Sequence, residues 1–468
     1  MRYLSTRGDA PVLGFEDALL TGLARDGGLY VPESYPTMTP AEIRGLRGLS
    51  YEEIAFRVMW PFLGGAFGEN VFRGLIARAY AQIRHPAKAP LVQTGPNDWI
   101  LELHHGPTLA FKDFAMLLVA EMFEHALEAR DGRVTIVGAT SGDTGSAAIE
   151  AFRGRRRASV AILYPHERIS PVQRRQMTTP SEPNVNALAV EGTFDDCQAL
   201  VKAMFNDHAF RDEMSLGAIN SINWGRVLAQ VVYYVSSAVA LGAPDRPVSY
   251  TVPTGNFGDI LAGEVARRMG LPIDTLVIAT NENDILHRTL STGVGEPAPV
   301  TPTVAPSMDV QVSSNFERLL FELYDRDGQA VARAMAEQKA GRPLHLPQGA
   351  RDALTNGWAS ARSPRADTLA TIARIRRESG MIIDPHTAIG VYAATLRRGD
   401  PAVPMVTLGT AHAAKFAEAV AEAVGIEAPL PPHMADLFDR PERVTRVAND
   451  LATVEAIVRE RCAPEGVS

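Results

Sequence analysis

The feature that most constrains the fold is an alternation of short apolar runs with amphipathic ones, which begins near residue 134. Apolar runs too short for helices are followed by stretches with helical spacing, and glycine or proline separates most of them. This order predicts an α/β fold in which parallel strands are covered by helices. The predicted strands are 134–137, 159–164 and 185–190, and the predicted helices are 146–152, 171–177 and 195–205.

The alternation resumes after a break, which predicts a second α/β unit. Its predicted elements are helix 227–241, strand 248–252, helix 259–269, strand 275–280, strand 405–408 and helix 413–424. Residues 292–306 are rich in Gly, Pro and Thr and are expected to form an irregular loop, and 341–364 a surface insertion.

The segment before residue 91 differs, because its apolar residues recur at helical spacing only. The predicted helices there are 14–23, 41–46, 51–62 and 69–83. At 468 residues the chain is long enough for about three domains. We therefore expect a mostly helical N-terminal domain, a small α/β domain and a large one, at residues 1–91, 92–215 and 216–468.

Charge and cysteine content exclude several classes of function. Acidic residues outnumber basic ones, 54 to 46, which argues against a nucleic-acid partner. Cys197 and Cys462 are far apart, so neither a disulfide framework nor a zinc site is expected, and no other metal site is indicated. The longest apolar segment, 227–240, is too short to span a membrane, and residues 1–7 lack the apolar core of a secretion signal. A cytoplasmic protein without a membrane partner is expected.

A lysine among apolar and aromatic residues stands where a helix is predicted to begin. Lys112 precedes an uninterrupted helical pattern over 114–130. The helix dipole and apolar surroundings both disfavour an ammonium there, so its pKa should be lowered. A neutral amine can attack an aldehyde to form a Schiff base. The alternative is an ordinary surface lysine.

Two glycine-bearing loops stand at strand-to-helix turns. In the first, Gly255 and Gly258 allow a close approach of the backbone, and the following helix offers free N–H groups to an anion. It matches neither a Walker A loop nor a dinucleotide fingerprint, so a monophosphate is favoured over a nucleotide. The second loop, 138–146, is rich in hydroxyls and could hold a carboxylate or phosphate. A plain turn and a helix cap are the respective alternatives.

A fourth candidate is Thr410, at the end of the last predicted strand, where ligands of open α/β sheets bind. An imine-forming lysine, a monophosphate loop, an oxyanion loop and a hydroxyl near a ring nitrogen are together what pyridoxal phosphate requires. The four segments therefore predict this cofactor.

Ordered motifs along the whole chain carry a family resemblance. They are 3–8, 26–32, 105–115, 140–145, 254–259 and 410–416. In these motifs the chain resembles the threonine synthases, which belong to the tryptophan-synthase-β-like group of fold type II pyridoxal-phosphate enzymes. The resemblance implies a lyase that acts on phosphates and converts O-phospho-L-homoserine and water into L-threonine and phosphate. For the oligomeric state, a monomer or a homodimer is expected.

The resemblance also implies a role for each site residue. Lys112 would be the Schiff-base lysine and Thr410 the partner of the pyridine nitrogen. The cofactor phosphate would be held by Gly255, Asn256, Phe257, Gly258 and Asp259. The substrate would be bound by Ser141, Gly142, Asp143, Thr144, Asn220, Ser221 and Arg226. Many relatives in the fold-type group have asparagine where Asp143 stands, which leaves its contact open. The histidines, including His386, are expected to be structural or peripheral.

Two other functions fit the same motifs. One is a pyridoxal-phosphate lyase that eliminates phosphate from a phospho-amino acid and releases a 2-oxo acid; the segment 26–32 favours the synthase. The other is a non-catalytic protein that binds the cofactor, against which the presence of Lys112 argues.

Overall fold

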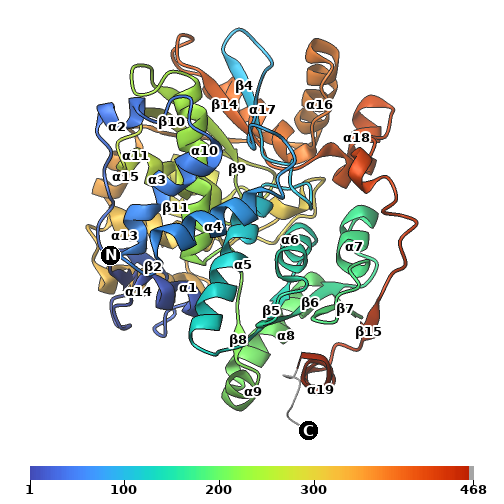
Figure 1. Cartoon of the computed structure of the whole chain (residues 1–468). Coiled ribbons are helices and arrows are strands. Elements are labelled where there is room, and N and C mark those ends of the chain that lie inside the picture. The colour runs from blue at the N-terminus through green and yellow to red at the C-terminus, as the bar shows by residue number, and fades with distance from the viewer. Residues whose placement is uncertain (463–468) are drawn as a thin grey trace.

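Two sheets organise the chain, for which a computed structural model describes residues 1–462 (Figure 1). The larger sheet has the strand order β13-β10-β9-β14-β4-β3, and the smaller has the order β15-β7-β6-β5-β8. Neighbours are parallel throughout both sheets except for β3 and β4. The larger sheet consists of β3 (Leu91–Gln93), β4 (Asp98–Glu102), β9 (Val248–Pro253), β10 (Ile273–Thr280), β13 (Trp358–Arg362) and β14 (Met405–Gly409). The smaller consists of β5 (Val134–Ala139), β6 (Ala158–Pro165), β7 (Val185–Val190), β8 (Leu216–Gly217) and β15 (Thr445–Val447).

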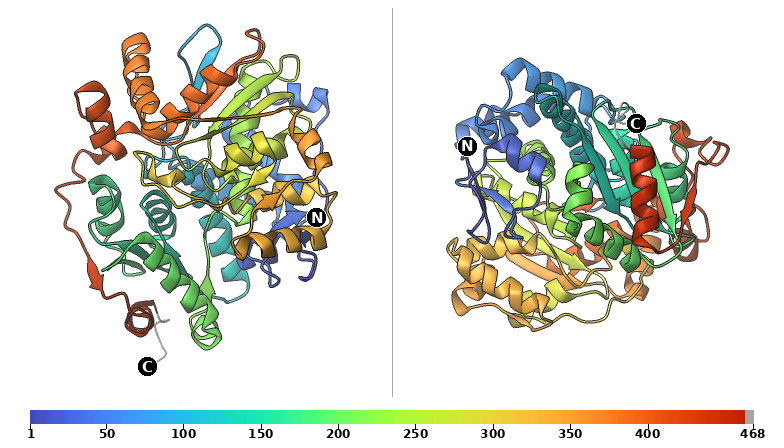
Figure 2. Two further views of the ribbon diagram at one scale, coloured as in Figure 1. Left: turned by 180° about the vertical axis from the view of Figure 1, so that it is seen from behind. Right: turned by 90° about the horizontal axis from the view of Figure 1, so that it is seen from below.

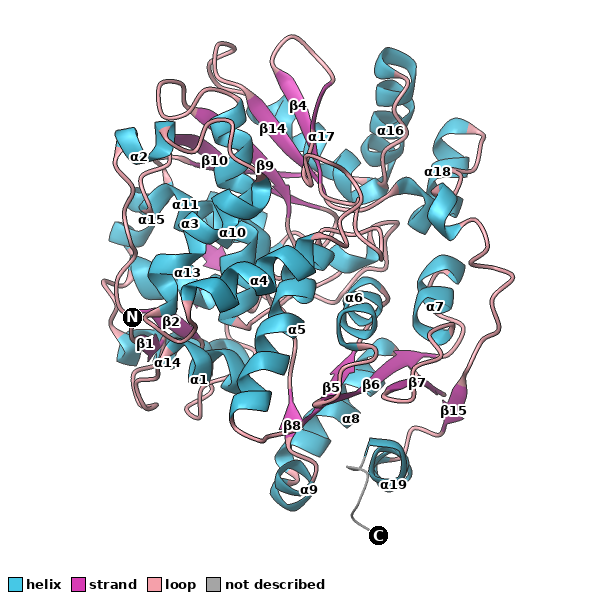
Figure 3. Ribbon diagram, viewed as in Figure 1, coloured by secondary structure: helices cyan, strands magenta, loops and turns pink. Residues whose placement is uncertain are grey.

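The central strands are apolar on both faces, which is why the sheets are parallel and covered by helices (Figure 3). Every residue of β7 and β9 is buried. On the larger sheet, α17 packs against four strands, and α11 packs against β9 and β10. The helices that follow strands or flank the sheets are α5 (Lys112–Ala129), α6 (Asp143–Phe152), α7 (Pro171–Thr178), α8 (Phe194–Asn206), α9 (His208–Glu213), α10 (Trp224–Ala240), α11 (Gly258–Arg268), α12 (Ile285–Thr292), α16 (Arg365–Ser379), α17 (Pro385–Arg397) and α18 (Ala417–Val424).

The N-terminal segment is mostly helical, as the sequence predicts. Its elements are β1 (Tyr3–Ser5), α1 (Phe15–Thr21), β2 (Tyr30–Pro32), α2 (Pro40–Arg44), α3 (Tyr51–Leu63) and α4 (Glu69–Tyr80). These helices cover the long central helices, since α3 packs on α10 and α4 packs on α5. The connecting elements are β11 (Val294–Gly295), η1 (Pro306–Met308), α13 (Phe316–Leu323), α14 (Gly328–Lys339), β12 (Leu344–His345), α15 (Gln348–Leu354), η2 (Ala413–Phe416) and η3 (Pro432–Met434).

The prediction of a surface insertion over 341–364 is wrong. That segment contains β13, which pairs in parallel with β10 along the edge of the larger sheet. The strand was missed because its apolar residues are few and a glycine-bearing turn precedes it. β4 was missed as well, although it lies between β14 and β3.

The end of the described chain returns to the smaller sheet (Figure 2). β15 pairs with β7, and α19 (Leu451–Cys462) packs against α8 and β6. Conversely, β4 joins the larger sheet although residues 92–215 were predicted to form the small unit. Sheet membership therefore departs from the predicted limits of the units. We propose that the small α/β unit combines residues 134–217 with 445–462, since its apolar core draws on both.

The site lies between the two sheets, where strands of both end. In residues 1–462, no helix has the length and apolarity needed to cross a membrane.

Candidate functional site

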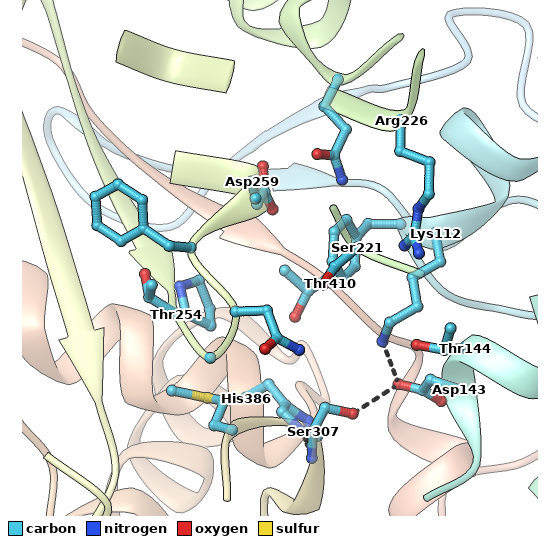
Figure 4. Close-up of a pocket in the computed structure, with 18 residues that line it drawn as sticks. Lys112, Asp143, Thr144, Ser221, Arg226, Thr254, Asp259, Ser307, His386 and Thr410 are labelled. Atoms are coloured by element: carbon cyan, nitrogen blue, oxygen red, sulfur yellow. Dashed lines mark hydrogen bonds and ion pairs between the residues drawn. The ribbon is translucent and has the colours of Figure 1, made fainter. Parts of the chain in front are cut away.

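A cavity opens where α5, α6, α10 and the start of α11 converge (Figure 4). Residues that follow strands of both sheets contribute to its walls. The lining residues are Phe111, Lys112, Asp143, Thr144, Ser221, Arg226, Gln230, Pro253, Thr254, Gly255, Asn256, Phe257, Gly258, Asp259, Ser307, Met308, His386 and Thr410.

Lys112 is the first residue of α5, as predicted, and its side chain is mostly buried. Burial lowers the pKa of its amine, while the nearby Asp143 carboxylate raises it and the Lys415 and Arg226 cations lower it. The net effect is a lowered pKa. The amine is therefore more readily deprotonated than an ordinary lysine, as a nucleophile toward an aldehyde must be.

Asp143 is the first residue of α6, and Figure 4 shows Lys112 and Ser307 converging on its carboxylate. The Lys112 ammonium lies 3.2 Å from Oδ2, and the Ser307 hydroxyl donates to the same oxygen over 3.2 Å. Burial alone would raise the pKa of this carboxyl, but Lys112 and Lys415 hold it well below its ordinary value. Asp143 is therefore an ionised, fully hydrogen-bonded group.

The loop from Gly255 to Asp259 joins β9 to α11 and presents the helix N-terminus to the cavity. Phe257 anchors it, with φ of 66° and with its ring centroid 5.2 Å from that of Phe316 and 5.9 Å from that of Trp358. A Cβ on Gly255 would lie 2.7 Å from the Ser307 carbonyl oxygen, so only glycine fits there. The loop is thus packed tightly enough to hold a small anion in a fixed place.

The loop ends at a second buried carboxyl, Asp259, whose protonation differs from that of Asp143. The Tyr233 and Tyr234 hydroxyls donate to its Oδ1 over 2.5 and 3.1 Å, and its buried Oδ2 has no hydrogen-bond partner in residues 1–462. Burial raises its pKa to about 7. A neutral carboxylic acid here could donate a hydrogen bond to an anion instead of repelling it.

Arg226 supplies a cation with free donors. Its side chain is buried on α10, and its Nε and Nη1 have no hydrogen-bond partner in the described chain. Burial lowers the pKa of the guanidinium to about 10, so it keeps its charge at neutral pH. Since a buried unpaired cation is costly, this guanidinium indicates that the cavity takes an anionic ligand.

The structure brings most of the predicted residues to the cavity and leaves three outside its lining. Lys112, all of 255–259, Thr410, Asp143, Thr144, Ser221 and Arg226 line it. Ser141, Gly142 and Asn220 do not. Gly142 instead closes the turn before α6, and the Asn220 amide oxygen accepts from the Ile222 N–H in the turn before α10.

His386 was expected to be structural or peripheral, but it lines the cavity. Its Nδ1 lies 2.7 Å from Asp384 Oδ2, and its Nε2 accepts from the Ser307 N–H over 3.3 Å. Ser307 was not predicted either, because the three-residue helix η1 that carries it is too short to show a periodicity in the sequence. For His386 the sequence did contain a signal. Asp384 followed by Pro385 is typical of the start of a helix, and His386 is therefore expected in the first turn of α17.

Comparisons with known proteins agree along the whole chain. Family models match residues 2–80 (threonine synthase N terminus), 85–340 (pyridoxal-phosphate dependent enzyme) and 387–458 (threonine synthase, C-terminal). The chain is 52% identical to a threonine synthase of Pseudomonas aeruginosa, over 98% of each protein. It is 42% identical to that of Saccharomyces cerevisiae, over 90% of this chain and 89% of the relative.

Solved structures give the same result. A pyridoxal-phosphate-bound threonine synthase from Brucella melitensis superposes with a TM-score of 0.97 at 54% identity, covering 99% of this chain and 100% of the other. The yeast threonine synthase superposes with a TM-score of 0.94 at 40% identity, covering 99% of each.

Proposed function

The chain belongs to the threonine synthase family, whose cofactor is pyridoxal phosphate, and we propose from that premise which side chains perform its reaction. That reaction converts O-phospho-L-homoserine and water into L-threonine and phosphate. The observation that carries the assignment is Lys112, a buried amine with a lowered pKa that lines the same cavity as the 255–259 loop.

The cavity fits the cofactor. Lys112 would bond to its aldehyde, and the 255–259 loop would hold its phosphate on the free N–H groups of α11. Thr410, whose carbonyl is fixed by the Phe111 N–H over 2.9 Å, would meet the ring nitrogen with its hydroxyl. When bound, the cofactor stabilises negative charge that develops on the substrate carbons.

The remaining cavity groups suit the substrate. Arg226 has free, charged donors for a phosphate, and Ser221 lies beside it in the lining. Thr144, at the N-terminus of α6, offers a hydroxyl and sits near free helix N–H groups, which suits a carboxylate. Ser141, Gly142 and Asn220 would act by shaping these loops.

Lys112 also moves protons in the proposed reaction. As a free amine, Lys112 would take the proton from the substrate Cα. An amine with a lowered pKa serves better here, because a larger fraction is unprotonated at neutral pH.

The test combines an absorption spectrum with product analysis. Purified protein should show the visible band of a lysine-bound cofactor and should form threonine and phosphate in equal amounts from O-phospho-L-homoserine. Lys112→Ala should lose the band and reduce turnover by at least about a thousandfold. Lys339→Ala, at an exposed lysine of α14, is the matched control and should behave as wild type. Phosphate with a 2-oxo acid instead of threonine would contradict the proposal.

A further inference from the structure

A second lysine is buried behind the cavity wall. Lys415, on η2, is 0% exposed, and its ammonium lies 2.7 Å from Asp143 Oδ1 and donates to the Thr108 carbonyl over 2.8 Å. It is not among the described residues that line the cavity. Removing an ammonium from water costs several kcal/mol unless the charge is paired, so this ion pair is what keeps Lys415 stable in its place.

The Asp143 carboxylate is shared between the two lysines, one on each oxygen. Oδ2 faces Lys112 and the Ser307 hydroxyl, each at 3.2 Å. Oδ1 faces Lys415 and accepts from the Gln173 amide over 2.9 Å. The donors come from α5, η1, η2 and α7, so several elements fix the position of the carboxylate.

This division has a consequence for Lys112. An unshared carboxylate 3.2 Å away would hold Lys112 as an ammonium, but the proposed reaction needs it as a free amine. Lys415 supplies a second positive charge to the same carboxylate and lowers the pKa of Lys112. The other titratable or charged groups around the pair are Asp113 on α5, Arg226 on α10, Asp259 on α11 and His386 on α17.

We propose that Lys415 is a positioning residue that acts on Lys112 through Asp143. It occupies one oxygen of the shared carboxylate and balances its charge, and this allows Lys112 to release its proton during the reaction. The inference rests on the proposed role of Lys112. Lys415 is buried and does not line the cavity, so it would influence Lys112 without contacting the substrate.

The test is the pH dependence of the absorption spectrum of the holoenzyme, which reports the protonation of the Lys112 nitrogen bound to the cofactor. In Lys415→Met and Lys415→Gln, the midpoint of this spectral transition should rise by about one pH unit or more. The acidic limb of the kcat profile should move in the same direction, with KM changed less than about twofold. Lys415→Gln keeps a hydrogen-bond donor toward Asp143 but carries no charge. A shift in this variant therefore reports the lost charge and not lost packing.

Three controls complete the experiment. Lys415→Arg should restore the wild-type midpoint, and Lys339→Met, at an exposed lysine, should leave it unchanged. In an Asp143→Asn background there is no carboxylate charge to balance, so adding Lys415→Gln should no longer shift the midpoint. This double variant keeps the test informative if Lys415→Met does not fold.

The positioning role alone would be overturned if the wild-type protein forms threonine but folded Lys415→Gln shows an unchanged or lowered midpoint of the spectral transition. Absence of the cofactor band in the wild-type protein would instead overturn the proposed function, so the two failures can be told apart.

Discussion

At the scale of single residues, two carboxyls of the site are in opposite states because their partners differ. Asp143 faces two ammonium groups, which lower its pKa well below the ordinary value. Asp259 receives only tyrosine hydroxyls on Oδ1, and burial raises its pKa to about 7. The sequence places Asp259 at the start of a predicted helix and Asp143 in the loop before one. Their charge depends on groups that the fold brings from other elements.

The state of Asp259 gives a prediction about pH. Its pKa is about 7 in the folded protein against 3.8 ordinarily, so the stability gained from its neutral form is present below about pH 4 and is lost as the pH rises through 7. Asp259→Asn removes this loss. As the pH rises from 5 to 8, the cofactor-free variant should gain stability relative to wild type, by about 1.4 kcal/mol per pH unit until the pH reaches about 7.

Thermal unfolding of the two cofactor-free proteins at pH 5 and pH 8 measures this difference. Asp131→Asn, at an aspartate with a 92% exposed side chain, is the control and should show no such trend. The same stability difference at both pH values would mean that Asp259 is already ionised in the folded protein at pH 5.

At the scale of elements, the strands with long apolar runs were predicted within one or two residues. β5, β6, β7, β9 and β14 begin within a residue of the predicted positions, because their burial on both faces requires such runs. The edge strand β13 and the polar-ended β4 were missed. Their pairing partners stabilise them, and their own local pattern is weak.

The 255–259 loop gives a prediction at this scale. Gly255→Ala would place a methyl 2.7 Å from the Ser307 carbonyl oxygen, so the loop or η1 must shift. Cofactor affinity should fall about tenfold, since overpacking typically costs 1–3 kcal/mol. Titration of cofactor-free protein with pyridoxal phosphate, followed by absorption, measures the affinity.

Gly349→Ala, where an added Cβ meets nothing within 4 Å, is the control for this substitution. Unaltered affinity in Gly255→Ala would show that the loop accommodates a side chain without moving its N–H groups.

At the scale of the whole molecule, the C-terminal segment packs onto the smaller sheet, whose other strands lie within residues 134–217. Val454 and Val458 of α19 are buried in the apolar core of the small unit, next to residues of β6 and β7. The small unit therefore depends on a segment that follows the last strand of the larger sheet by some 40 residues in sequence (Figure 2).

Val458→Ala should destabilise this unit by about 2 kcal/mol, through lost apolar burial and the cavity that remains. Hydrogen exchange should become faster in β6 and β7 and remain unchanged in β9 and β10. Glu460→Ala, at an exposed position of α19, should leave both sheets unaffected. Unaltered exchange in β6 and β7 of the valine variant would contradict a shared core.

From the amino-acid sequence alone we could predict the α/β class, the N-terminal helices, a helix that begins near Lys112 and the glycine-bearing loop at Gly255. Each of these depends on the periodicity or backbone geometry of a continuous segment, which a sequence displays directly. The folded protein was needed to show that Lys415 shares Asp143 with Lys112, that His386 and Ser307 line the cavity, and that β15 pairs with β7 in the smaller sheet. These contacts join segments far apart in the chain, and the burial and charge that create them exist only once the sheets are assembled.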